Sequence, residues 1–339
     1  MSIRSRLKFR TRLRSIIHRL WPPEPKPLIL MYHRIAEKPI DYWNLAVSPA
    51  HFAEHLHIIA KTRQPFALKD FSSKLVAGTL PLNAIAVTFD DGYLDNLTSA
   101  KPLLEQAGVP ATVFIATGYT GAERFWWDEL EKLFFFGNRT QGFEFWVQNH
   151  PIRIDFGDES PARQDGTTPH RLLRKRSASL LETWEVLRRL ERDQRDLAMG
   201  KLRSIVGKLN YFADFGRPMN RDEVRTLVAG GLVTIGAHTV SHPVLDELPP
   251  TTCRREITNS KVACEHLSSI SVDLFAYPFG RFNAKVCEAV KAAGFSSACS
   301  TQHGPSNAAS DVFALPRIHV PNRDGASFER LLHSASTVR

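Results

Sequence analysis

Short apolar runs recur along the chain, separated by longer segments in which apolar residues follow helical spacing. The clearest run, residues 85–89 (Ile-Ala-Val-Thr-Phe), leads directly into Asp90, Asp91 and Gly92. Comparable runs lie at 28–33, 111–116, 232–237, 274–277, 296–299 and 313–318. Runs of this length are typical of strands that are buried on both faces of a parallel sheet. We therefore predict a strand at each of these positions.

The segments between the runs carry the start and stop signals of helices. Ser48 before Pro49 combines a cap with a proline in the first turn. Asn220 and Glu223 have the spacing of a capping box, and Gly108 is placed to end a helix. Further helices are predicted at 251–268 and 283–293. Because strands alternate with helices, we predict an α/β fold with a parallel sheet, and the number of repeats favours a barrel.

The alternation is interrupted between residues 118 and 219. Residues 125–130 precede an aromatic helix or loop, 157–170 are polar and rich in turn residues, and 171–209 show apolar residues at helical spacing. We predict that 118–219 is an insertion in a domain spanning 28–331. Residues 1–27 are predicted to form a basic arm followed by a proline-rich linker.

The composition is that of an ordinary globular protein. Of 339 residues, 43% are hydrophobic and 23% charged, which is enough for a sizeable core. The net charge is +9, but no nucleic-acid-binding module accompanies the basic residues, so we predict no nucleic-acid partner. In residues 1–21 basic and apolar side chains interleave. This pattern is typical of an amphipathic helix on an anionic membrane surface, or of a solvated basic arm.

Cysteine usage and hydropathy bear on location. The chain has no C-x-x-C pair, so its four cysteines are predicted to be free thiols in a reducing compartment. No run of about 18 apolar residues predicts a transmembrane helix, and the N-terminal segment lacks the apolar stretch of a secretory signal. We therefore predict a cytoplasmic protein, in peripheral contact with the inner membrane face where the basic arm binds it. The cysteines are Cys253, Cys264, Cys287 and Cys299.

Two pairs of side chains of types that can bind a metal ion follow predicted strands. Asp90 and Asp91 follow 85–89, and His238 and His242 follow 232–237. Histidines four residues apart can reach one ion, and α/β folds place their chemistry at the carboxyl ends of strands. Asp91 and the histidines would supply one carboxylate and two imidazoles, leaving Asp90 as a base. The same set binds iron in oxygenases, but their all-β fold disagrees with the alternation here.

Three motifs in order resemble those of the polysaccharide deacetylases, the fourth family of carbohydrate esterases. They are 88–92 (Thr-Phe-Asp-Asp-Gly), 238–242 (His-Thr-Val-Ser-His) and 275–280 (Phe-Ala-Tyr-Pro-Phe-Gly), and the resemblance extends from about Leu28 to Leu331. It implies a distorted (β/α) barrel of about seven strands. The implied activity is metal-dependent removal of acetyl groups from carbohydrate.

The resemblance also implies roles for individual residues. Asp91, His238 and His242 would hold a divalent ion, with Zn²⁺ favoured over Co²⁺ or Ni²⁺, and Asp90 would be the general base. The ion would lower the pKa of its water and polarise the acetamide carbonyl. A backbone N–H near Phe279 would help to stabilise the oxyanion.

The general acid is one departure from the common family pattern. A late leucine–histidine motif is replaced by 315–319 (Leu-Pro-Arg-Ile-His), in which the spacing does not match. The early 31–34 (Met-Tyr-His-Arg) resembles instead the subgroup that acts on poly-N-acetylglucosamine. We therefore expect His33 to be the acid, with His319 as the alternative.

A second departure concerns the third motif. Relatives often carry an arginine where this chain has Ala276, and Arg317 is predicted to supply the missing cation to Asp90. Tyr277, Pro278 and Phe279 are expected to form an apolar wall for the substrate. The family's tryptophan–aspartate element resembles residues 126–128, from which Trp127 and Asp128 are expected to line the groove.

The resulting prediction is a metal-dependent N-deacetylase acting on N-acetylhexosamine units of a polysaccharide or glycan intermediate. An O-acetyl esterase of the xylan type and an amidohydrolase of non-sugar C–N bonds remain alternatives, because the family contains both. A third alternative is a carbohydrate-binding barrel without catalysis. Nothing in the sequence predicts the oligomeric state.

Overall fold

The fold is taken from a computed structural model that describes residues 24–137, 139–147, 150–156, 173–207 and 216–337. The basic N-terminal segment lies outside these residues, so its membrane contact stays a prediction. The turn-rich stretch 157–170 also lies outside them.

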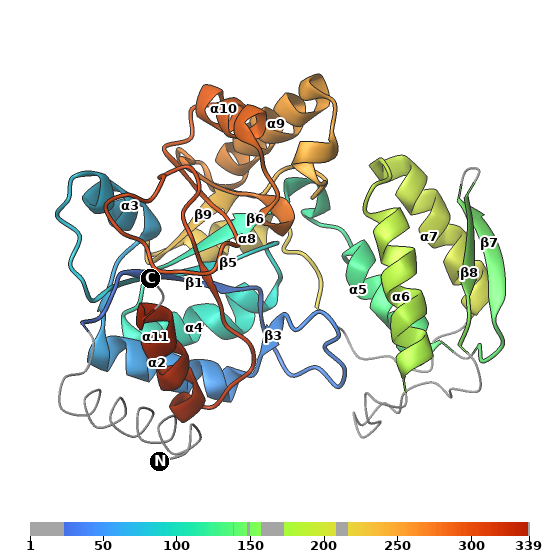
Figure 1. The fold of residues 1–339 in the computed structure, drawn as a ribbon, viewed down its shortest axis with the longest axis horizontal. Coiled ribbons are helices and arrows are strands. Elements are labelled where there is room, and N and C mark those ends of the chain that lie inside the picture. The colour runs from blue at the N-terminus through green and yellow to red at the C-terminus, as the bar shows by residue number, and fades with distance from the viewer. Residues whose placement is uncertain (1–23, 138, 148–149, 157–172, 208–215, 338–339) are drawn as a thin grey trace, which may run out of the picture.

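A curled, parallel sheet forms the centre of the molecule (Figure 1). Seven strands follow the order β11-β10-β9-β6-β5-β1-β12, and β4 (Gln64–Pro65) adds to β5. The predicted α/β fold, a distorted (β/α) barrel of about seven strands, is therefore confirmed, and its curled parallel sheet forms a half-barrel. Its strands are β1 (Leu28–Tyr32), β5 (Ala84–Phe89), β6 (Ala111–Ile115), β9 (Val233–Ala237), β10 (Leu274–Ala276), β11 (Ser297–Cys299) and β12 (Ile318–His319).

The last strand is shorter than the sequence predicts. Instead of a strand over 313–318, β12 covers only Ile318–His319, and Leu315 makes one isolated parallel bridge to Cys299. Pro316 explains the difference, because a proline has no N–H to donate to a neighbouring strand. The predicted strand was therefore wrong in its extent.

Helices cover the sheet, and their predicted termini are largely confirmed. The side chain of Ser48 accepts a bond from the His51 N–H, and the capping box between Asn220 and Glu223 is present. Gly108 ends its helix with a φ of +64°, which glycine adopts without strain. The helices are α2 (Pro49–Thr62), α3 (Leu68–Val76), α4 (Lys101–Ala107), α8 (Arg221–Val228), α9 (Pro250–Ser268), α10 (Ala284–Ala292) and α11 (Gly325–Thr337), with a π-helical turn at Asn96–Ala100 before α4.

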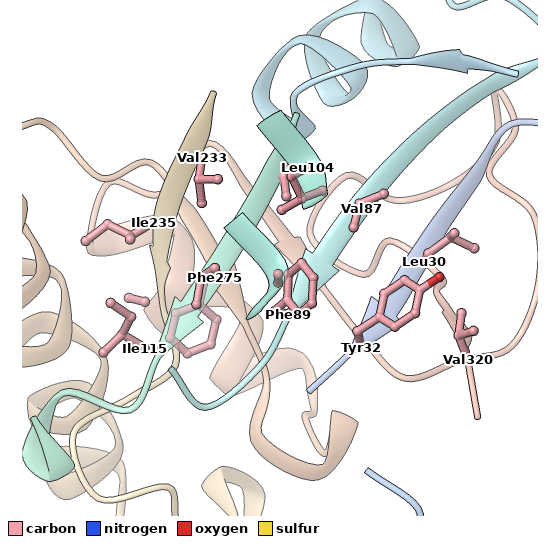
Figure 2. Close-up of a cluster of buried hydrophobic side chains, with 14 of the residues drawn as sticks. Leu30, Tyr32, Val87, Phe89, Leu104, Ile115, Val233, Ile235, Phe275 and Val320 are labelled. Atoms are coloured by element: carbon pink, nitrogen blue, oxygen red, sulfur yellow. The ribbon is translucent and has the colours of Figure 1, made fainter. Parts of the chain in front are cut away.

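The main core lies on the face of the sheet shown in Figure 2. Leu30, Val87, Phe89, Ile115 and Val233 come from four neighbouring strands, and each is at most 3% exposed. Because parallel strands pair in register, their side chains meet in layers and exclude water. Burial of these runs fixes where each strand ends, and so fixes the residues that follow it.

The predicted insertion contains its own elements beside the sheet (Figure 1). These are α5 (Trp126–Phe136), β7 (Phe143–Val147), β8 (His150–Ile154), α6 (Arg174–Leu187) and α7 (Arg192–Val206). The aromatic segment is thus a helix, and the helical spacing over 171–209 corresponds to two helices. Their apolar faces pack together with Tyr93 and Ala116, which follow β5 and β6. The insertion therefore contacts the carboxyl ends of the strands.

Two further predictions concern the cysteines and membrane spans. All four cysteines are buried and none is in a disulfide. Within the described ranges, every helix is too short or too polar to cross a membrane.

Candidate active site

Three side chains from two strand ends converge on one point. Asp91 follows β5, and His238 and His242 follow β9. The Nε2 atoms of the histidines are 3.2 Å apart, and Asp91 Oδ1 lies 3.7 Å from His238 Nε2 and 3.4 Å from His242 Nε2. All three residues are buried. Within the described residues, this is the group of histidines and carboxylates that could hold a metal ion.

The backbone around these side chains is strained. Asp91 has a φ of 75° and His242 a φ of 54°, and Thr239 between the histidines has a φ of 64°. Such left-handed conformations cost on the order of 1–3 kcal/mol each for residues other than glycine. The surrounding structure maintains these conformations at two of the three ligand residues and in the loop between the histidines.

The spacing of the ligand atoms fits a divalent cation. Ligands about 2.0–2.2 Å from an ion, at tetrahedral or octahedral angles, lie about 3.0–3.5 Å from one another. The observed triangle has nearly these sides. His238 Nδ1 lies 2.8 Å from the carbonyl oxygen of Ala276 and must donate to it, so a neutral His238 presents a lone pair at Nε2. Asp91 Oδ1 is buried and has no hydrogen-bond donor among the described residues.

Burial sets the protonation of the cluster. It lowers the pKa values of His238 and His242 below their ordinary values, so both imidazoles are neutral and able to bind a cation. Burial, and then the charge of Asp90, raises the pKa of Asp91 well above its usual range. A bound cation would reverse this effect, because it stabilises the carboxylate. The donor set therefore fits the metal that the sequence predicts.

Asp90 stands beside the cluster and is paired with Arg317. The guanidinium donates from Nη1 to Asp90 Oδ1 and from Nη2 to Asp90 Oδ2, both at 2.7 Å. Burial would raise the pKa of Asp90, but the charge and hydrogen bonds of Arg317 outweigh it and hold the pKa below its usual range. Asp90 is thus an anion next to the proposed metal position.

The two candidate acids have different surroundings. His33 lines the same pocket as Asp90 and Asp91, and its buried Nδ1 has no hydrogen-bond partner among the described residues. Burial lowers the pKa of His33 to about 3, and the charge of Asp90 opposes this shift. His319 does not line the pocket, and its Nε2 donates to the carbonyl oxygen of Asn44 at 3.0 Å.

The predicted apolar wall needs correction. Of its three residues, only Phe279 lines the pocket, where its ring is 4.6 Å from that of His242. Tyr277 is fully buried in the core, and its hydroxyl donates to the carbonyl oxygen of Phe313. Pro278 is also buried and does not line the pocket. Phe279 has a φ of 57°, so the chain turns there and the three side chains do not share one face.

Trp127 lines the pocket as predicted, but Asp128 does not. The Asp128 Oδ2 atom accepts from the Tyr93 hydroxyl at 2.8 Å, and that hydroxyl accepts from Trp127 Nε1 at 2.8 Å. The Trp127 ring is 5.0 Å from the His242 ring. Asp128 therefore acts behind the pocket, by orienting Trp127 through Tyr93.

Sequence reasoning missed several residues of the site. Trp43, Leu45, Trp184 and Thr301 also line the pocket, which has a volume of about 190 Å³. The spacing of Trp184 marks it only as an apolar position of a helix. A larger hollow of about 570 Å³ lies between α9 and α10, but no histidine lines it, so the chemistry points to the smaller pocket.

Glu256 on α9 is another residue that the sequence does not single out. Its Oε2 accepts from the N–H groups of Val240 and Ser241 at 2.8 and 2.9 Å, and its Oε1 accepts from the Ser241 hydroxyl at 2.9 Å. Both residues lie between His238 and His242. Glu256 thus holds the loop that carries the two histidines.

Comparisons with known proteins identify sequences that this chain resembles. The family model described as polysaccharide deacetylase matches residues 77–150 and 206–298, which include the Asp90–Asp91 pair and both histidines. YxkH of Bacillus subtilis (strain 168), a protein named as a polysaccharide deacetylase, is 24% identical over 117 residues. That alignment covers 34% of this chain and 42% of YxkH, so the chain spans less than half of this curated relative.

Solved structures share the fold. The deacetylase PplD of Streptococcus pyogenes, in complex with acetate, is 18% identical with a TM-score of 0.59, over 91% of this chain and 99% of PplD. A de-N-acetylase from Aggregatibacter actinomycetemcomitans is 13% identical with a TM-score of 0.55, over 90% of this chain and 99% of that one. The motif order, the converging side chains and the matching family model lead to one conclusion: this chain belongs to the polysaccharide deacetylase family.

Proposed function

We propose that the protein hydrolyses the N-acetyl group of an N-acetylhexosamine unit in a glycan. The observation that carries the proposal is the convergence of Asp91, His238 and His242 beside an Asp90 that Arg317 keeps ionised. Asp91 and the two histidines would hold a divalent cation, with Zn²⁺ favoured. When bound, such a cation polarises the acetamide carbonyl and lowers the pKa of water.

The chain's own residues supply the proton transfers. Asp90 is buried and anionic, so it can take a proton from the attacking water. His33 lines the pocket and is neutral, so it must first gain a proton before it can give one to the departing amine. The amine needs this proton because it is a poor leaving group otherwise. The backbone N–H of Phe279 is our candidate donor to the oxyanion.

The choice of an N-acetyl substrate rests on the resemblance of the early Tyr-His motif and on the fold shared with a de-N-acetylase. The catalytic residues do not by themselves identify the substrate, because an O-acetyl esterase would use the same Asp90, Asp91 and histidines. The test must therefore compare both kinds of acetyl group.

Acetate release tests the proposal. Metal-stripped protein is incubated with N-acetylglucosamine oligomers and, separately, with acetylated xylan, before and after addition of Zn²⁺, Co²⁺ or Ni²⁺. We expect metal-dependent release from the N-acetylated oligomers, and loss of it in Asp90→Asn. Release from xylan alone would favour the O-acetyl esterase. Glycan binding without any release would favour a non-catalytic barrel, and failure to bind metal would overturn the assignment of the three ligands.

A further inference from the structure

Two tryptophans that line the pocket lie outside the segments matched by the family model. Trp43 lies in the loop between β2 (Arg34–Ile35) and β3 (Ala46–Val47), and Trp184 lies on α6 of the insertion. The family model matches residues 77–150 and 206–298, so neither tryptophan belongs to the matched segments. Both line the cavity that contains Asp90 and the proposed metal ligands. They are features of this chain rather than of the family model.

The two tryptophans contact each other and complete an arc of rings. Their centroids are 5.3 Å apart, and Trp184 meets Phe279 edge-on at 5.6 Å. Phe279 in turn contacts His242, and Trp127 contacts His242 from another side. The arc therefore runs from Trp43 through Trp184 and Phe279 to the metal ligand His242, with Trp127 beyond it. Trp43 and Trp184 therefore form one continuous aromatic part of the pocket lining.

Neighbouring side chains hold this aromatic cap, the pair Trp43 and Trp184, in place. Tyr42 packs edge-on against Trp43 at 4.9 Å and also contacts Phe135 of α5. The Arg188 guanidinium lies over the Trp184 ring at 5.3 Å. The Nε1 atom of Trp43 is buried and has no hydrogen-bond acceptor among the described residues. A sugar hydroxyl in the pocket could accept from it, which would satisfy a buried donor.

The capped pocket is small. Its volume of about 190 Å³ is below the roughly 300–1,000 Å³ of pockets that enclose drug-sized ligands. This leaves room for about one sugar ring. A polysaccharide that continued on both sides of the acetylated ring would need two exits, whereas a pocket of this volume, bounded in part by Trp43 and Trp184, favours a ring at the end of a chain. The faces of Trp184 and Phe279 are suited to the apolar face of a single ring.

We propose that the aromatic cap makes this enzyme select a single N-acetylhexosamine ring, presented as the terminal unit of a glycan or as a small glycan intermediate. Units inside a long chain are excluded. This specificity rests on the proposed deacetylase function, but the cap can be tested separately through binding.

The first test maps where the metal-loaded enzyme acts on N-acetylglucosamine oligomers of one to six units, with mass-spectrometric sequencing of the products. We expect deacetylation of a terminal unit, with kcat/KM independent of length beyond the dimer. In Trp184→Ala, internal units should become substrates and KM for the monomer should rise about 5–10-fold. Trp184→Phe should restore most of the selectivity. Attack on internal units by the unaltered enzyme, as fast as on terminal ones, would overturn the proposal.

The second test measures binding to metal-stripped protein by calorimetry, so it does not depend on turnover. Monomer and hexamer should bind with affinities within about threefold, because only one ring is enclosed. Trp184→Ala should weaken monomer binding about 5–10-fold. The matched control is Trp146→Ala, which removes a tryptophan of β7 that is 54% exposed and should leave binding unchanged. A hexamer that binds far more tightly than the monomer, or no binding by either, would overturn the cap. Sugar binding without acetate release would instead overturn only the proposed function.

Discussion

Arg317 and Asp90 are 227 residues apart in the chain and form a bidentate, fully buried ion pair. Arg317 also donates from Nε to the Ser300 carbonyl oxygen at 2.9 Å and from Nη1 to the Thr88 hydroxyl at 3.2 Å. The guanidinium therefore has partners on several sides, which offsets the cost of removing it from water. Arg317 thus supplies to Asp90 the positive charge that Ala276, in the third motif, cannot.

Substitution of Arg317 by methionine should destabilise the protein by about 3–5 kcal/mol, because Asp90 would stay buried without its counter-ion. It should also abolish most activity, since the pKa of Asp90 would rise. Urea unfolding and acetate release measure the two effects. Arg330→Met, at an exposed position of α11, is the control and should cost less than about 0.5 kcal/mol. Equal stabilities of the two variants would show that the ion pair contributes little.

The two candidate acids can be separated by substitution with glutamine. His33 lines the pocket, whereas the Nε2 of His319 is bonded to Asn44 outside it. We expect His33→Gln to lower kcat by about 10²–10⁴ with little change in metal affinity. His319→Gln should change kcat less than about tenfold. The reverse order would assign the acid to His319.

Loss of Glu256 should weaken metal binding without removing a ligand. Its carboxylate holds the loop between the two histidines through three hydrogen bonds. Support of this kind typically contributes 10–100-fold in metal affinity. We expect that weakening for Zn²⁺ in Glu256→Ala, measured by competition with a chelator. Glu265→Ala is the matched control on α9, because Glu265 accepts instead from the Val272 N–H. Unchanged affinity in Glu256→Ala would contradict a positioning role.

A buried carboxyl away from the metal ligands predicts a pH effect on stability. Burial raises the pKa of Glu131 to about 7, despite an ion pair with Lys38 at 3.2 Å. The folded state then binds this proton more strongly than the unfolded state does. Stability from Glu131 is therefore present below its unfolded pKa of about 4.3 and decreases as the pH rises towards 7.

The change amounts to on the order of 3 kcal/mol between pH 4.5 and pH 7.5. Glu131→Gln cannot titrate, so its urea-unfolding free energy should fall less over this range than that of the unaltered protein. Parallel pH profiles for the two proteins would show that Glu131 has no raised pKa.

The local sequence pattern alone was sufficient to predict most of the strands, the helix caps and the candidate metal ligands. Buried parallel strands need continuous apolar runs, and caps depend on residues three positions apart, so both are visible in the sequence. The histidines and Asp91 could be grouped because parallel strands bring their carboxyl ends to one edge of the sheet. The metal itself, the catalytic roles and the domain boundaries stay predictions.

Only the tertiary structure decided which distant side chains meet. Arg317 reaches Asp90 because β12 pairs with β1 and β1 with β5, an order that no short-range pattern contains. The insertion brings Trp184 against Phe279, although a tryptophan at helical spacing indicates no more than packing. The Phe279 side chain lines the pocket and the Tyr277 side chain does not, because the positive φ of Phe279 turns the chain at that residue. Spacing along the chain determines local structure, but long-range packing determines which faces close around the site.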